Sequence, residues 1–306
     1  MPNIKIIIPS IGRGGLTDSI KAISTDAEEY ENGNVHVLII SDGVVPFEIN
    51  TNQISNLQSV LSPNLVIEHF LNPKKGVSAA LNYGLSFITA DDLFMIFTDD
   101  DEWVHARIKT LTLALRDFPS ADIILSQALL NDENGIKLRP RIQIDSNQNI
   151  LDYLYGREIF LENPVYFSLV TCIARGKVSK VRFREQFSSH EDVVWLAEVQ
   201  ARNFRISGIS ETTAKLNVSL GRSSARMNSG ADKPFLEWLE ETNSKVFSNY
   251  VWVHAQRANS SQGNFVIVLK SFIKAIKTSK PTPRQVLISI FLTCLALVRR
   301  IKKSIP

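Results

Sequence analysis

Apolar and polar positions along the first 130 residues follow two alternating periods. Short continuous apolar runs of strand length are separated by longer segments in which apolar residues recur at helical spacing. The strand-like runs are Ile4–Ile8, His36–Ile40, Leu65–His69, Leu93–Phe97 and Ala121–Ser126, and the helical segments are Leu16–Ser24, Ile49–Leu61, Val77–Ile88 and Ala106–Phe118. This alternation predicts an α/β fold with a mostly parallel sheet that helices cover on both faces.

The pattern becomes less regular beyond residue 130. Helical spacing returns from Pro234 to Ile305, with breaks near Pro281 and Pro283. The elements predicted before it are a strand at Ser168–Ala174, a helix at Asp192–Arg202, and short strands at Arg205–Ile209 and Thr213–Ser219. We therefore expect one α/β domain over residues 1–230, with halves of about 1–130 and 131–230, and a helical extension over residues 231–306.

The charges are unevenly spread along the chain. The formal net charge is only +3, but the segment from Phe265 to Pro306 holds nine basic residues and no acidic one. The remaining residues have 25 basic and 31 acidic side chains, a net charge of −6. Such asymmetry predicts an acidic partner for the basic tail, either membrane lipid or nucleic acid.

The basic tail has the pattern of an interfacial segment. Phe265–Lys280 is amphipathic, and Gln285–Val298 is an uncharged stretch of fourteen residues that is followed by another basic cluster. An uncharged stretch of this length is too short to span a bilayer. A peripheral membrane contact is the favoured interpretation, and two helices packed on the preceding domain are the alternative.

The cysteines and the first residues favour a cytoplasmic location. Cys172 and Cys294 form neither a disulfide framework nor a zinc-binding spacing. A strand-like run follows Met1-Pro2-Asn3 directly, without the apolar core and cleavage site of a signal peptide.

Four consecutive acidic residues, Asp99 to Glu102, follow the fourth apolar run. Crowded carboxylates raise one another's pKa unless a cation neutralises them, and hard oxygen ligands favour magnesium or manganese together with substrate phosphates. The segment therefore predicts a metal–diphosphate site. An acidic turn that stabilises the start of the helix near Ala106 is an equally simple interpretation.

Several segments together resemble the family 2 glycosyltransferases, which have the GT-A fold. The matching pieces, in order, are Ile6–Ser10, Ile39–Gly43, Gly76–Leu85, Phe97–Trp103 and His190–Asp192, and the resemblance covers about residues 4 to 225. It implies a Rossmann-like, mostly parallel sheet that binds a nucleotide-sugar donor.

The resemblance also implies roles for individual residues. The nucleotide-sugar contacts would be Pro9, Ser10, Asp42, Gly76, Asn82, Asp99 and Asp100, the metal ligands Asp99 and Asp101, and the catalytic pair Glu191 and Asp192. Asp192 would be the base that activates an acceptor hydroxyl. Arg222 lies in a segment that the family often closes over the diphosphate, and Arg13 is placed to reach a phosphate.

The function expected from these residues is inverting sugar transfer that depends on Mn²⁺ or Mg²⁺. Its partners would be the donor and a glycan or lipid-linked acceptor, in surface polysaccharide or other glycan synthesis at the inner face of the cell membrane.

Two other functions are alternatives to sugar transfer. A sugar nucleotidyltransferase would use a Gly- and Arg-rich loop such as Gly12–Gly15, but it has no need of the Glu191–Asp192 pair. A nucleic-acid-binding protein with a basic tail is disfavoured, because the larger part of the chain is net acidic.

Overall fold

The structure is a computed structural model. It describes residues 2–12, 15–30, 33–41, 61–132, 135–140, 143–156, 168–187, 189–217, 233–254, 273, 276, 281–283, 285–291 and 294. The predicted helix at Ile49–Leu61 falls almost wholly outside these residues.

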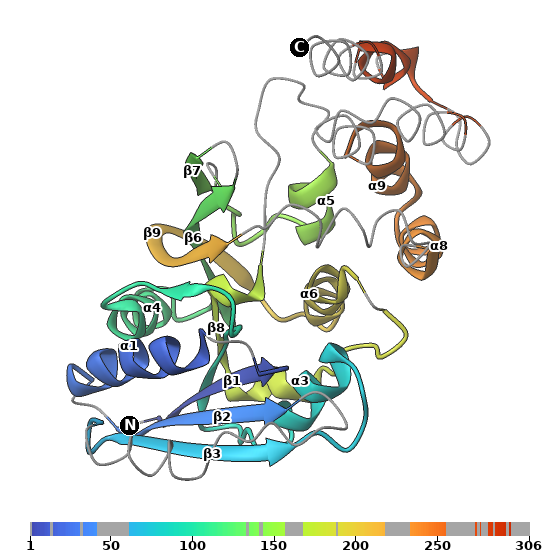
Figure 1. Cartoon of the computed structure of the whole chain (residues 1–306). Helices are drawn as coiled ribbons and strands as arrows, with labels where there is room; N and C mark the ends of the chain where they lie inside the picture. The colour runs from blue at the N-terminus through green and yellow to red at the C-terminus, as the bar shows by residue number, and fades with distance from the viewer. Residues whose placement is uncertain are drawn as a thin grey trace, which may run out of the picture. The chain divides into compact units, whose positions relative to one another are not determined.

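The described strands form one nine-stranded sheet (Figure 1). The first four are parallel, in the order β3-β2-β1-β4, and span Leu65–Leu71, Val35–Ser41, Ile4–Ser10 and Leu93–Ile96. The sheet continues through β8 (Cys172–Arg175), β6 (Ile123–Asp132), β9 (Ile206–Asn217) and β5 (Glu102–Trp103), and β7 (Gly135–Arg139) pairs with β6. The predicted α/β fold is thereby confirmed, but the sheet is mixed, because β4–β8, β6–β8, β6–β7 and β5–β9 pair antiparallel.

Helices cover both faces of this sheet because its strands are apolar on both sides. Helices α1 (Leu16–Glu28) and α4 (Arg107–Asp117) lie side by side on the face to which Ile6 of β1 contributes (Figure 1). Helix α3 (Val77–Leu85) covers the opposite face, where Gly84 approaches Ile7 so closely that a Cβ atom would lie 2.5 Å from its side chain. Helix α6 (Glu191–Ala201) packs on the same face, where Trp195 contacts Phe94 of β4.

Two of the predicted elements differ in the structure. The predicted strand Ser168–Ala174 begins as a 3₁₀ turn at Leu169–Thr171, because the Ser168 side chain accepts a hydrogen bond from the Val170 N–H and stabilises a turn. The two short strands predicted between residues 205 and 219 are one strand, β9, whose pairing with β6 shifts register near Gln127.

The buried carboxylate of Asp26 joins α1 to the start of α4. Ala106, just before α4, has a left-handed backbone with φ of 61° and no side-chain cap of its own. Asp26 supplies the cap, because it accepts hydrogen bonds from the backbone N–H groups of Ala106 at 2.6 Å and Ile108 at 3.1 Å. It also accepts one from Trp103 Nε1 at 2.8 Å, so it anchors the segment on both sides of His105.

The chain divides into two compact units, residues 1–150 with 166–220 and residues 151–165 with 221–306. The second unit contains α8 (Lys233–Thr242), α9 (Ser244–Asn249) and a π-helical turn at Tyr250–His254, together with most of α5 (Ile150–Tyr155). Tyr155, Phe235 and Tyr250 pack edge to face in its core. Within the described part of the chain, no helix is long and apolar enough to cross a membrane.

We predict that Asp26→Ala lowers the free energy of unfolding by about 3 kcal/mol, because three N–H donors, two of them buried, lose their acceptor. Urea denaturation monitored by circular dichroism measures the effect. Asp18→Ala is the matched control, since Asp18 is an exposed residue of the same helix. Equal stability of the two variants would show that Asp26 does not anchor α4.

Candidate active site

The loops that follow β1 and β4 are joined at the carboxyl edge of the sheet. The Ser10 hydroxyl donates to Asp99 Oδ2 at 2.6 Å and accepts a hydrogen bond from the Gly12 N–H at 3.0 Å. Gly15 also approaches the acidic residues, since a Cβ atom there would lie 2.6 Å from the Asp99 carbonyl oxygen. Only glycine fits at this approach, and Ser10 and Asp99 are therefore held in one site.

The last residues of β9 hold the acidic loop, Asp99–Glu102, from its other side. The backbone N–H of Asn217 donates to Asp101 Oδ1 at 3.0 Å, and the Asn217 side chain reaches the Asp100 carbonyl at 3.3 Å. Lys215 donates to both Glu102 oxygens at 2.9 Å. This clamp keeps four carboxylates close together despite their repulsion.

The acidic residues differ in electrostatic environment. Burial raises the pKa of Asp101, and hydrogen bonds from the Thr98 hydroxyl (2.5 Å) and the Asn217 N–H oppose that rise only in part. The pKa of Glu102 is lowered, chiefly by its bond to Lys215. Glu102 therefore already has a cationic partner, whereas the desolvated Asp101 would gain most from a bound cation.

A fully buried arginine, Arg107, lies behind the loop and was not predicted from the sequence. It donates to the Val170 carbonyl, and its guanidinium lies 4.4 Å from the Trp103 ring centroid and 5.2 Å from that of Phe97. Burial lowers its pKa to about 10, and it is attracted electrostatically to Asp101. A cation beneath two aromatic residues has no sequence pattern that separates it from an ordinary helix-surface arginine.

Asp192 lies in the first turn of α6, next to Glu191. Its side chain keeps some exposed surface, yet protein atoms crowd its carboxyl group. This burial, and then the repulsion by Glu191, raise the pKa of Asp192 to about 7. The hydrogen bond that it accepts from the Val193 N–H at 2.8 Å does not offset the rise.

Asp192 and Arg107, which lies behind the acidic loop, both act on the first residue of β8. The charges of Asp192 and Arg107 both act on the buried thiol of Cys172, whose pKa burial raises to about 12. Cys172 begins β8, whose next residue, Ile173, pairs with Met95 near the end of β4. The carboxyl end of β4 thus has Asp101 after it and Asp192 near it.

Three of the other predicted site residues occupy defined positions. Pro9 is half-buried in β1 opposite Ile40. Gly76 directly precedes α3 and has φ of 120°, a backbone conformation that residues other than glycine adopt only with strain. The Asn82 side chain hydrogen-bonds the backbone of Phe183. Arg13, Asp42 and Arg222 lie outside the described residues.

The donor set near the acidic loop suits a cation that is shared with a substrate. Among the described residues, no three His, Cys, Asp or Glu side chains form a group that could hold a metal. Asp99 and Asp101 nevertheless supply two carboxylates in one loop, and Mg²⁺-type ions are commonly held by one or two carboxylates plus substrate phosphates. The residues fit that arrangement and do not fit a closed protein cage.

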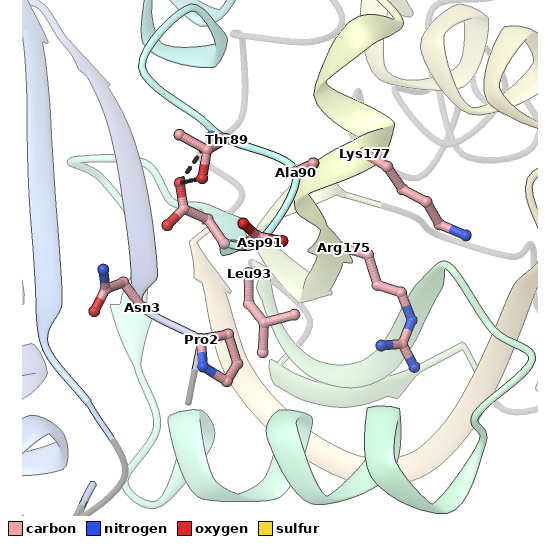
Figure 2. A pocket seen from close by; sticks show the side chains of 9 residues that line it. Pro2, Asn3, Thr89, Ala90, Asp91, Leu93, Arg175 and Lys177 are labelled. Atoms are coloured by element: carbon pink, nitrogen blue, oxygen red, sulfur yellow. Dashed lines mark hydrogen bonds between the residues drawn. The ribbon is translucent and has the colours of Figure 1, made fainter.

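A separate cavity of about 700 Å³ lies at the opposite edge of the sheet (Figure 2). Pro2, Asn3 and Leu93 line it at the amino ends of β1 and β4. Its charged groups serve the fold: Asp92 accepts from Thr89 at 2.8 Å (dashed in Figure 2), and Arg175 donates to backbone carbonyls such as that of Ala121. The cavity is therefore distinct from the acidic site.

Comparison with known proteins identifies the fold and the family. A family model described as glycosyl transferase family 2 matches residues 6–180. No protein with a curated description matches the sequence. The sheet, its covering helices and the carboxylates at its carboxyl edge are those of a glycosyltransferase with the GT-A fold. The chain belongs to glycosyl transferase family 2.

Solved structures of two glycosyltransferases share this fold at low sequence identity. Staphylococcus aureus TarS 1–349 in complex with UDP-GlcNAc is 15% identical with a TM-score of 0.55, and the match covers 99% of this chain and 73% of that one. The same protein in complex with UDP gives a TM-score of 0.53 at 15% identity, covering 99% and 83%. GalNAc-T7 with UDP, GalNAc and Mn²⁺ is 9% identical with a TM-score of 0.51, covering 72% and 44%.

We predict that Asp192→Asn stabilises the protein increasingly as the pH rises from 5 to 8. The folded pKa of about 7 lies above the ordinary value of 3.8, so between these values the unfolded chain is ionised while the native state holds the proton. Native stability therefore falls with rising pH until the native carboxyl group has also ionised. Removal of this penalty should yield about 1–3 kcal/mol at pH 8, measured by urea denaturation.

Asp117→Asn is the control for this comparison, since Asp117 is an exposed carboxylate at the end of α4. A stability difference between Asp192→Asn and the unmodified protein that stays constant from pH 5 to pH 8 would contradict the raised pKa.

Proposed function

We propose that the protein transfers a sugar from a nucleoside-diphosphate sugar to an acceptor hydroxyl, with inversion at the anomeric carbon. The observation that supports this most directly is the hydrogen bond from Ser10 to Asp99, which makes one site of the loops after β1 and β4. Both loops lie within the residues that match the family model. Asp192 lies beyond residue 180, so its role rests on its own chemistry and position.

On the donor side, Asp99 and Asp101 would hold a divalent cation, Mn²⁺ or Mg²⁺, together with the diphosphate. Such an ion, when bound, stabilises the negative charge that gathers on the departing diphosphate. Ser10 orients the Asp99 carboxylate by donating to it, and Lys215 keeps Glu102 neutralised in an ion pair at 2.9 Å. Three acids of the loop, Asp99 to Asp101, thereby remain, and Asp99 and Asp101 are the pair that we assign to the cation.

On the acceptor side, Asp192 is the general base. A base is most effective when its pKa is close to the working pH, and burial together with Glu191 brings the pKa of Asp192 to about 7. In its ionised form the carboxylate takes the proton of the acceptor hydroxyl as that oxygen attacks the anomeric carbon. One carboxylate base acting on the face opposite the leaving group gives a single displacement, and hence inversion.

The acceptor that we propose is a glycan or lipid-linked hydroxyl, in the synthesis of surface polysaccharide or another glycan at the cytoplasmic membrane face. This location is supported by the basic tail, in which Leu287, Ile290 and Phe291 expose 68%, 48% and 50% of their surface. Apolar side chains among basic residues suit the interface of an anionic bilayer.

Paired variants separate donor binding from transfer. We predict that Asp101→Asn loses the Mn²⁺-assisted part of UDP affinity, measured by calorimetry with and without Mn²⁺. Asp192→Asn should keep that affinity but lose on the order of 10²–10⁴-fold in kcat, measured with a panel that begins with UDP-sugars. If no nucleoside diphosphate gains affinity from a divalent cation, or if Asp192→Asn turns over normally, the proposed mechanism is wrong.

We predict that the full-length protein co-sediments with vesicles containing anionic lipid and not with purely neutral ones, and that high salt releases it. Replacing both Ile290 and Phe291 by Ser should weaken vesicle binding without changing UDP affinity. Leu113→Ser is the control, since Leu113 is an exposed leucine of α4. A full-length protein that ignores anionic vesicles would show that the tail serves another purpose.

A further inference from the structure

The side chain of Asn82 on α3 is hydrogen-bonded by two residues of another segment, chiefly by Phe183. Its Nδ2 donates to the Phe183 carbonyl at 2.9 Å, and its Oδ1 accepts from the Phe183 N–H at 2.7 Å. The second Nδ2 hydrogen points to Glu185 Oε1 at 3.4 Å. Arg182 Nη1 also donates to the Asn82 backbone carbonyl at 2.9 Å. Both donor hydrogens of the Asn82 amide are thus directed to the segment 182–185.

The same segment packs on the helix that carries the proposed base. The buried Phe183 ring stacks on Trp195 of α6, with centroids 5.0 Å apart and planes 9° apart. Trp195 Nε1 donates to the Val181 carbonyl at 2.9 Å, and the indole is completely buried. Segment 181–185 therefore lies between α3 and α6 and contacts both.

Trp195 and Asp192 share one face of α6, because residues three apart on a helix are neighbours. A rotation of α6 that moved Trp195 off Phe183 would also turn the Asp192 carboxylate away from its present direction. The Asn82 amide fixes the backbone of Phe183, so it limits this rotation of α6. Asn82 itself belongs to α3, whose amino end at Gly76 lies in the expected nucleotide pocket.

We infer that Asn82 is a positioning residue for Asp192, which it orients through Phe183 and Trp195, and that it is not the nucleotide-sugar contact implied by the family resemblance. The inference rests on the proposed function, in which Asp192 is the base. A donor ligand could accept a hydrogen bond from the Asn82 amide only by displacing Phe183 or Glu185, whose oxygens already take both Nδ2 hydrogens.

The test is Asn82→Ala, assayed with Mn²⁺ and the donor that the panel identifies. The expected result is a fall in kcat on the order of ten- to a hundredfold, with donor KM and UDP affinity changed less than about twofold. The acidic limb of the kcat–pH profile should also move to lower pH. A loosened α6 would admit water to Asp192, and hydration of the carboxylate would lower the pKa that this limb reports. A purely structural defect would lower the amount of active enzyme and leave that limb in place.

Two further variants keep the inference open to refutation. Trp195→Phe retains the ring stack but loses the bond to Val181, and it should shift kcat and the pH limb in the same direction. Tyr83→Phe, at the next position of α3, keeps its ring contacts with Phe70 and Phe87 and should behave as the unmodified protein. If Asn82→Ala does not fold, Asn82→Asp replaces it, because aspartate keeps the acceptor for the Phe183 N–H.

A rise of tenfold or more in donor KM and UDP dissociation constant, with an unmoved pH limb, would show that Asn82 contacts the donor. Normal kinetics in Asn82→Ala would also overturn the inference. Asp192→Asn, measured alongside, separates these failures from failure of the proposed function. If Asp192→Asn is active, Asp192 is not the base and the proposed function fails. If it is inactive, only the role of Asn82 is at issue.

Discussion

Repulsion among the carboxylates of Asp99–Glu102 is the constraint on which the rest of the site depends. Neighbouring negative charges disfavour one another's ionisation and push a loop apart unless fixed groups oppose them. Here the opposition comes from several strands and helices: the Ser10 hydroxyl at the end of β1, the Asn217 backbone at the end of β9, the Lys215 ion pair and the buried charge of Arg107. Lys215 and Arg107 offset only part of the negative charge of the four acids, and a divalent ion would offset more of it.

The supports of the acidic loop are also supports of the fold, so the site cannot be loosened without a cost in stability. Asp26 binds Trp103 on one side of the loop's exit and Ala106 on the other. Trp103 in turn covers the Arg107 guanidinium. Two of its buried nitrogen atoms, Nε and Nη1, have no hydrogen-bond partner among the described residues. A protein tolerates such a buried cation when nearby carboxylates and aromatic rings compensate for its lost hydration.

The sequence predicts the parallel strands, the covering helices and the acidic loop, because each depends on local apolar periodicity or on neighbouring residues. It does not predict contacts between distant segments. Nothing near Asp26 indicates that it caps a helix 80 positions away, and nothing near Asn82 indicates that its amide is held by Phe183. The Ser168 turn was missed for the opposite reason, since one local hydrogen bond outweighed an apolar run that reads as a strand.

Asp101 and Asp192 show how burial alone leaves the role of an acid undecided. Burial is the largest cause of the raised pKa in both residues. Around Asp101 a hydroxyl and a backbone N–H donate to its oxygens and a buried arginine attracts it. These groups offset the effect of burial only in part, so a bound cation would add to the compensation. Around Asp192 the neighbouring charge is Glu191, which favours uptake of a proton. Two desolvated carboxyl groups with different charged neighbours suit the proposed reaction, in which one would help to neutralise the leaving group and the other would deprotonate the nucleophile at the same pH.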